Sequence, residues 1–229
     1  LIETTGMADP GPVAQTFFTD DDVKAKTRLD AIVTVIDAKH FFGQLEQGSE
    51  AEQQVAFADV ILLNKTDLVS ADELKKVEDR IRGINRYARI FHTQKSQIEL
   101  DAILDKGAFD LGRILEFEPD FLHSGHDHHH EDEVRSLSIT ADRPVDPDKF
   151  QKWMGALLQI KGADIFRSKG ILAIDGAPRR YVYQGVHMMM DSAWGTQWKD
   201  GEKRSSKLVF IGRNLDGDNL QRGFEECLK

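Results

Sequence analysis

Cysteine is almost absent from this sequence, and so are the features that mark membrane and secreted proteins. Cys227 is the only cysteine among 229 residues, so no disulfide can form within the chain, and the composition suits a reducing cytoplasm. We expect its thiol to be a small buried hydrophobe rather than a nucleophile. No apolar run approaches 18 residues, and no signal peptide is recognisable. We therefore expect a cytoplasmic protein without a membrane partner.

Positive charge is also in deficit. The 30 Lys and Arg residues are outnumbered by 39 Asp and Glu residues, which gives a formal net charge of -9. Because no basic stripe offsets this excess, the charge argues against a nucleic-acid partner. With 40% hydrophobic and 30% charged residues, the composition is that of a globular protein with one large domain or two modest ones.

Strand and helix signals alternate through the first half of the chain. The β-branched run 31–36 and the apolar run 60–63 predict strands buried on both faces, and residues 1–2 are expected to end an earlier strand. Helix starts are predicted by one proline-containing cap and three capping boxes: Asp9-Pro10, Ser49-x-x-Glu52, Ser70-x-x-Glu73 and Ser96-x-x-Glu99. This alternation predicts an α/β fold with a mostly parallel sheet, whose ligands bind at the carboxyl ends of the strands.

The second half has a different pattern, that of a smaller α+β domain with an antiparallel sheet. Strands are predicted within 134–141, 164–175, 179–190 and 207–213, and helices after Asp146-Pro147 and over 218–228. We expect a first domain over 1–117, a histidine-rich linker over 118–134 and a second domain over 135–229.

Asn64-Lys-Thr-Asp67 directly follows the strand predicted at 60–63 and has the form of a guanine-recognition motif, Asn-Lys-x-Asp. The Asp67 carboxylate can accept hydrogen bonds from both the ring N–H and the exocyclic amine of guanine. Adenine has no such pair of donors, so ATP would leave the carboxylate unpaired. Lys65 can lay its methylene stem along the base, and Asn64 can brace the loop. We assign Asn64, Lys65, Thr66 and Asp67 to nucleotide binding.

The partner of this motif, a G-x-x-x-x-G-K-[ST] phosphate loop, does not occur, and neither does any Gly-Lys dipeptide. The chain also opens without methionine at what looks like the end of a buried strand. We therefore expect it to be the later part of a longer protein.

Glu3-Thr-Thr-Gly6 is the candidate catalytic segment. An acidic residue at the end of a strand can hold the Mg²⁺ shell, and a glycine three positions later lets the backbone approach a γ-phosphate. We therefore select Glu3 and Gly6. The alternative is a strand followed by a glycine-containing turn.

A histidine-rich run provides candidate ligands for Zn²⁺, Co²⁺ or another transition metal. It contains His126, His128, His129 and His130, and three acidic residues follow it. The alternative is a polar linker without a bound metal. His187, by contrast, is expected to be an ordinary strand residue.

Taken together, these residues resemble the CobW-like family of P-loop GTPases. The resemblance is carried by Glu3 to Pro10, Thr34-Val-Ile-Asp37, Asn64 to Asp67, the histidine-rich linker, and three later segments: Phe166-Arg-Ser-Lys-Gly170, Gln184-Gly-Val-His187 and Leu208-Val-Phe-Ile-Gly212. It implies an N-terminally incomplete GTPase sheet, with Glu3 and Gly6 on the magnesium and γ-phosphate side. The family's phosphate loop and its Cys-x-Cys-Cys metal motif both precede the position of Glu3 and are missing here. The resemblance therefore implies that this chain is inactive as an independent GTPase. Its sheet would be completed by another segment or by another copy in a homo-oligomer, or left open.

The leading hypothesis is a GTP-hydrolysing metallochaperone that delivers zinc or cobalt to a client metalloprotein. The second domain, with Trp194 and Trp198, is the expected docking surface for the client. One alternative is a metal-storage module that uses the histidine run and hydrolyses no nucleotide. Another is an ATP-dependent kinase or synthetase on the same fold, which Asp67 disfavours.

Overall fold

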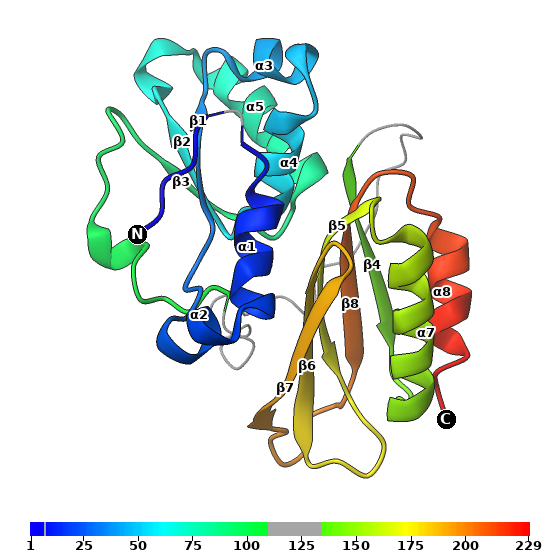
Figure 1. Cartoon of the computed structure of the whole chain (residues 1–229). Helices are drawn as coiled ribbons and strands as arrows, with labels where there is room; N and C mark the ends of the chain where they lie inside the picture. The colour runs from blue at the N-terminus through cyan, green and yellow to red at the C-terminus, as the bar shows by residue number, and fades with distance from the viewer. Residues whose placement is uncertain (7, 110–133) are drawn as a thin grey trace. The chain divides into compact units, whose positions relative to one another are not determined.

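The computed structural model of the chain describes residues 1–6, 8–109 and 134–229. It divides into two compact units, Leu1–Asp110 and Leu111–Lys229, and each unit has its own sheet (Figure 1). The boundaries proposed from the sequence remain a prediction, because almost all of the expected linker 118–134 lies outside the described residues. None of the helices in the described ranges has both the length and the apolar character needed to cross a membrane.

The first unit contains the expected parallel sheet, with strand order β1-β2-β3. Its central strand β2 is fully buried, as its uninterrupted apolar sequence predicts. The same prediction is wrong for β1, which leaves Val33 and Val35 exposed on one face. The strands are β1 (Val33–Asp37), β2 (Val60–Asn64) and β3 (Arg89–His92). The helices are α1 (Pro10–Thr19), α2 (Asp21–Lys26), α3 (Phe41–Gln47), α4 (Glu50–Phe57) and α5 (Ala71–Ile84), with short 3-10 turns η1 (Thr66–Leu68) and η2 (Leu100–Ala102).

Local capping chemistry explains where two of these helices begin. The predicted capping box of α5 is complete, because Ser70 and Glu73 each accept from the other's backbone N–H. Asp9 caps α1 by accepting from the Gly11 N–H at 2.8 Å. The box predicted at Ser49 is wrong, although α4 does start there. The Ser49 side chain makes no capping bond, and Glu52 pairs instead with Arg80 at 2.6 Å.

Two expected elements of the first unit are wrong. Residues 1–5 form no strand, because they are exposed and make no ladder with β1, β2 or β3. The helix expected after Ser96 is only the three-residue turn η2. Ser96 has a left-handed backbone with φ of 54°, whereas a helix N-cap needs an extended one.

The second unit is the expected antiparallel sheet with two helices on one face (Figure 1). The strand order is β4-β8-β5-β6-β7, so β5, β6 and β7 are neighbours in chain order, and the last strand β8 lies between β4 and β5. The strands are β4 (Arg135–Ala141), β5 (Ile165–Leu172), β6 (Arg179–Val186), β7 (Met189–Gln197) and β8 (Ser206–Gly212). The helices are α7 (Pro147–Lys161) and α8 (Gly217–Glu225).

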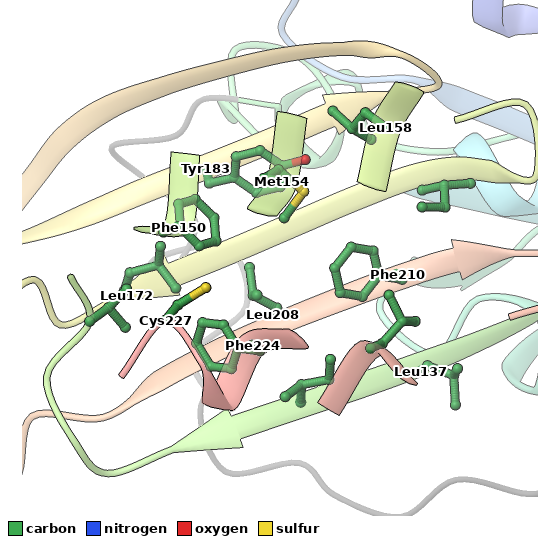
Figure 2. Packing of buried hydrophobic residues seen from close by; sticks show 14 of the residues in the cluster. Leu137, Phe150, Met154, Leu158, Leu172, Tyr183, Leu208, Phe210, Phe224 and Cys227 are labelled. Atoms are coloured by element: carbon green, nitrogen blue, oxygen red, sulfur yellow. The ribbon is translucent and has the colours of Figure 1, made fainter. Parts of the chain in front are cut away.

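Aromatic packing holds these helices on the sheet (Figure 2). Phe150 of α7 meets Tyr183 of β6 edge to face at 5.8 Å and Phe224 of α8 at 6.5 Å between ring centroids. Cys227 belongs to the same core and is 1% exposed, which confirms that it is a buried hydrophobe. Burial raises the pKa of its thiol to about 11.

Three expectations for the second unit need correction. His187 is a turn residue with φ of 51°, so the strand predicted over 179–190 is two strands, β6 and β7. The separate strand β7 was not predicted. Trp198 is 6% exposed beneath the Arg180 guanidinium, and only Trp194, at 47%, has an exposed ring. A docking surface that uses both tryptophans is therefore wrong.

Replacing Asn85 should strongly destabilise the first unit. Asn85 is 1% exposed. Its amide donates to the Val55 and Ala58 carbonyls at 2.8 and 2.9 Å, and its Oδ1 accepts from the N–H groups of Tyr87 and Ala88. Because Asn85→Ala leaves these buried groups unpaired, we expect a loss of about 2–4 kcal/mol in urea unfolding. Asn219→Ala is the matched control on an exposed side chain, and an equal loss there would contradict this role for Asn85.

Two helical glycines should respond in opposite directions to alanine. A methyl group at Gly223 of α8 would overlap the indole ring of Trp153, whereas one at Gly155 of α7 would meet nothing within 4 Å. We expect Gly223→Ala to destabilise by about 1–3 kcal/mol through overpacking. Gly155→Ala should stabilise by about 0.5–1 kcal/mol, since alanine favours the helix. Thermal unfolding followed by circular dichroism measures both, and shifts of the same sign would refute the packing argument.

Candidate functional site

The carboxyl ends of β1, β2 and β3 meet at one edge of the parallel sheet. Asp37 at the end of β1 lies opposite Asn64 at the end of β2, and Leu63 lies opposite His92 of β3. The ladder runs one residue further on each side. The Ala38 N–H donates to the Asn64 carbonyl at 3.0 Å, and the Thr93 N–H donates to the Leu63 carbonyl at 2.8 Å. The segments that follow the three strands are therefore held side by side.

Asn64 is braced from the β3 side. Its Oδ1 accepts from the Ser96 N–H at 2.8 Å and from the Thr93 hydroxyl at 3.2 Å. An amide nitrogen cannot accept from an N–H, so this pairing fixes the orientation of the side-chain amide. The Nδ2 donor has no partner within the described part of the chain and is available to a ligand.

Lys65 is held from the β1 side. Its backbone is left-handed, with φ of 60° and ψ of 34°, and its Nζ contacts Asp37 Oδ2 at 2.5 Å. The same oxygen lies 3.0 Å from Nδ1 of His40. Burial alone would raise the pKa of Asp37, but the bonds from Lys65, His40 and two backbone N–H groups outweigh it and lower the pKa to about 2.

Asp67 stands apart from this network. It lies in the 3-10 turn η1 and is exposed, and no group in the described ranges donates to its carboxylate. Thr66 beside it is used within the fold, because its hydroxyl donates to the Thr93 carbonyl at 3.2 Å. The motif thus has two kinds of residue: Asn64, Lys65 and Thr66 bond to neighbouring segments, and Asp67 keeps both acceptor oxygens open.

The loop from Thr93 to Ser96 was missed by the sequence reasoning. It supplies both groups that bond to the Asn64 Oδ1. Lys95 and Ser96 have φ of 50° and 54°, a strained conformation that non-glycine residues keep only where the surroundings require it. The loop contains no glycine, the residue that would have indicated a left-handed backbone in the sequence. The one available signal was its position after a strand next to β2.

Glu3 and Gly6 lie in the segment before α1. Glu3 is exposed, and no described residue forms an ion pair with it. The backbone around Gly6 is tied to α4, since the Gln54 side-chain amide donates to the Gly6 and Ala8 carbonyls at 3.0 and 3.1 Å. Sequence reasoning did not select Gln54, because an interior helix residue gives no sign of contacting a loop 46 residues earlier.

The predicted metal ligands His126, His128, His129 and His130 lie outside the described residues. Within the described ranges, no group of three or more His, Cys, Asp or Glu side chains is placed to hold a metal ion. The described part of the chain thus leaves the predicted transition-metal site untested.

The edge of the sheet presents complementary chemistry for a purine. Asp67 provides two acceptor oxygens, Asn64 provides one amide donor, and the Lys65 side chain, 45% exposed, provides an aliphatic surface. A carboxylate with no internal donor favours a ligand that brings two N–H donors of its own, because an unpaired acceptor is unfavourable once covered.

Both halves of the chain match known protein families. The CobW/HypB/UreG nucleotide-binding domain matches residues 1–92, and the cobalamin synthesis protein cobW C-terminal domain matches residues 134–228. The zinc chaperone YjiA of Escherichia coli is 35% identical over 98% of this chain and 69% of its own length. The Saccharomyces cerevisiae zinc-regulated GTPase metalloprotein activator 1 is 30% identical, with coverage of 100% of this chain and 62% of the relative.

The structure agrees with these matches. The crystal structure of the Zn(II)-bound YjiA GTPase from E. coli superimposes with a TM-score of 0.82 at 33% identity, over 98% of this chain and 69% of that one. The zinc chaperone CobW of Pseudomonas aeruginosa is 32% identical, and the chain spans 63% of its length. This chain therefore belongs to the CobW family of nucleotide-binding proteins, with the family's nucleotide-binding and C-terminal domains in order.

Proposed function

We propose that the protein binds and hydrolyses GTP and uses the cycle to deliver a divalent transition metal, zinc or cobalt, to a client metalloprotein. The family supports the nucleotide and the metal: relatives carry the names zinc chaperone and zinc-regulated GTPase metalloprotein activator. The choice between zinc and cobalt, the client and the cytoplasmic location are parts of the proposal.

The observation that carries the proposal is the contrast between Asp67 and its neighbours. The surrounding polar groups are braced by the fold, and the Asp67 carboxylate is left with both oxygens open. Guanine brings a ring N–H and an exocyclic amine in the spacing that one carboxylate accepts. Adenine brings no such pair, so the same carboxylate would reject ATP and selects against the kinase or synthetase alternative.

On the phosphate side, we assign Glu3 and Gly6. An exposed carboxylate without an internal partner fits an outer ligand of Mg²⁺, which usually binds through one or two carboxylates and the substrate phosphates. When bound, Mg²⁺ would neutralise charge on the β- and γ-phosphates. Because Gln54 of α4 donates to the Gly6 carbonyl, binding of a γ-phosphate at the Gly6 backbone would be coupled to α4.

The metal is the cargo, and the histidine-rich segment is its proposed binding site. Neutral imidazoles suit zinc and cobalt, and the acidic residues beside them would raise the local cation concentration. A storage module without nucleotide hydrolysis would use the same histidines. The two functions differ in whether GTP is required.

Asp67→Asn should reverse the base preference. The amide offers a donor where guanine needs an acceptor, so we expect GTP affinity to fall about 100-fold and xanthosine triphosphate, which carries an oxygen at that position, to bind better. Competition titrations against a fluorescent guanine nucleotide on the full-length protein measure both affinities. Asp72→Asn, the same charge change on the exposed first turn of α5, is the control. Unchanged selectivity in Asp67→Asn would overturn the guanine assignment.

Deleting residues 123–133 should separate metal binding from nucleotide hydrolysis. We expect calorimetry with Zn²⁺ or Co²⁺ to lose a binding event, because the deletion removes most of the imidazoles, while GTP turnover in the metal-free protein stays within about twofold. A Gly-Ser segment of equal length is the control for loop length. Unaltered metal binding would mean that the segment is only a linker. Absent GTP turnover in the unmodified full-length protein would favour the storage function.

A further inference from the structure

We propose that Asp37 is a positioning residue for nucleotide binding, which anchors the Lys65 ammonium so that the lysine stem forms a fixed wall for the base. The inference rests on the proposed function and adds to it a residue outside the Asn-Lys-x-Asp motif. Its basis is the contact of 2.5 Å between Lys65 Nζ and Asp37 Oδ2 at the shared edge of β1 and β2.

The Asp37 carboxylate is itself fixed by the fold. Its Oδ1 accepts from the backbone N–H groups of Lys39 and His40 at 3.0 and 3.2 Å. Its Oδ2 faces the His40 ring and the Lys65 ammonium. The strand register places Asp37 directly opposite Asn64, so the carboxylate lies beside the first residue of the motif before any ligand arrives. An acceptor held at three points besides Lys65 is a firm anchor for a flexible chain.

Lys65 needs such an anchor. Lysine has four rotatable side-chain bonds, and ordering them opposes binding unless they are already ordered in the free protein. Contact with Asp37 fixes the ammonium end, and the left-handed backbone fixes the other. The side chain remains 45% exposed, so the stem between the two fixed ends is open to a flat ligand.

The charges favour a persistent contact. The Asp37 side chain is only 18% exposed, so its interaction with the ammonium is screened less than that of a surface pair. The carboxylate is ionised at every pH near neutrality, because its pKa lies near 2. By contrast, the Lys75–Asp79 pair on α5 is 74% and 65% exposed, and pairs of that kind contribute little.

The anchor acts on a different part of the ligand from Asp67. A lysine stem contacts the face of the base, which all purines share, whereas Asp67 reads the edge, where guanine and adenine differ. Loss of Asp37 should therefore weaken guanosine and inosine nucleotides by the same factor. Loss of the Asp67 acceptor should instead change the affinity for guanosine nucleotides relative to that for inosine nucleotides.

The experiment measures nucleotide affinity in the full-length protein with Asp37→Asn and Asp37→Ala. Asparagine keeps the shape of the anchor and its backbone bonds, so it remains informative if the alanine variant does not fold. We expect about tenfold weaker binding of both GTP and ITP, which corresponds to about 1.4 kcal/mol. Asp79→Asn, the same charge change in the exposed pair, should change either affinity less than about twofold.

A double-mutant cycle with Lys65→Ala separates positioning from general structural damage. If Asp37 acts through Lys65, Asp37→Asn in the Lys65→Ala background should weaken GTP binding less than about twofold. Full additivity, or an unchanged GTP affinity in Asp37→Asn, would overturn the inference. Asp67→Asn, measured in parallel, distinguishes failure of this inference from failure of the proposed function. If Asp67→Asn reverses the base preference and Asp37→Asn leaves GTP affinity unchanged, only the anchor proposal is wrong. If Asp67→Asn leaves the base preference unchanged, the guanine assignment itself is wrong.

Discussion

The in-register parallel pairing of β1, β2 and β3 is the constraint on which the candidate site depends. Parallel neighbours cannot be joined by a tight turn, so each strand returns through a connection that contains helices. All three strands therefore end at the same edge. The pairing of Asp37 with Asn64 and of Leu63 with His92 decides which side chains meet there. The contacts of Asn64, Lys65 and Thr66 with Ser96, Asp37 and Thr93 cross between segments that this register aligns.

The polar residues at that edge fall into two groups, those that bond to other residues of the fold and one that does not. Asn64, Lys65 and Thr66 each bond to a neighbouring strand end. Asp67 bonds to no residue in the described ranges. The first group restricts the backbone and side-chain freedom of the motif, so a ligand that reaches Asp67 meets a surface that is already ordered. Such preorganisation lowers the entropy lost on binding.

Sequence reasoning succeeded where the chemistry is local. The Ser70 capping box and the caps at Asp9 and Asp146 are confirmed, because each depends on residues within four positions. The parallel sheet of the first unit and the antiparallel sheet of the second are also as expected. Sequence reasoning failed where a residue distant in the sequence determines the conformation or the hydrogen bonds of a side chain. Glu52 is taken by Arg80, and Ser96 turns its N–H to Asn64. Strand β7 was missed because an exposed edge strand needs no regular apolar alternation. The motif at 64–67 was contiguous and visible, and Asp37 was expected at the end of a neighbouring strand. Thr93 and Ser96 become neighbours of the motif only through the sheet.

The buried thiol in the core of the second unit has a practical consequence for spectroscopy and metal titration. Cys227 is 1% exposed and burial raises its pKa to about 11, so its side chain is a buried neutral thiol at pH 7. Thiolates are the form that binds soft metals and reacts with alkylating reagents. In the folded chain, cobalt should therefore give no sulfur-to-metal charge-transfer band. A thiol reagent that labels Cys227 reports unfolding of the second unit and is silent about metal loading.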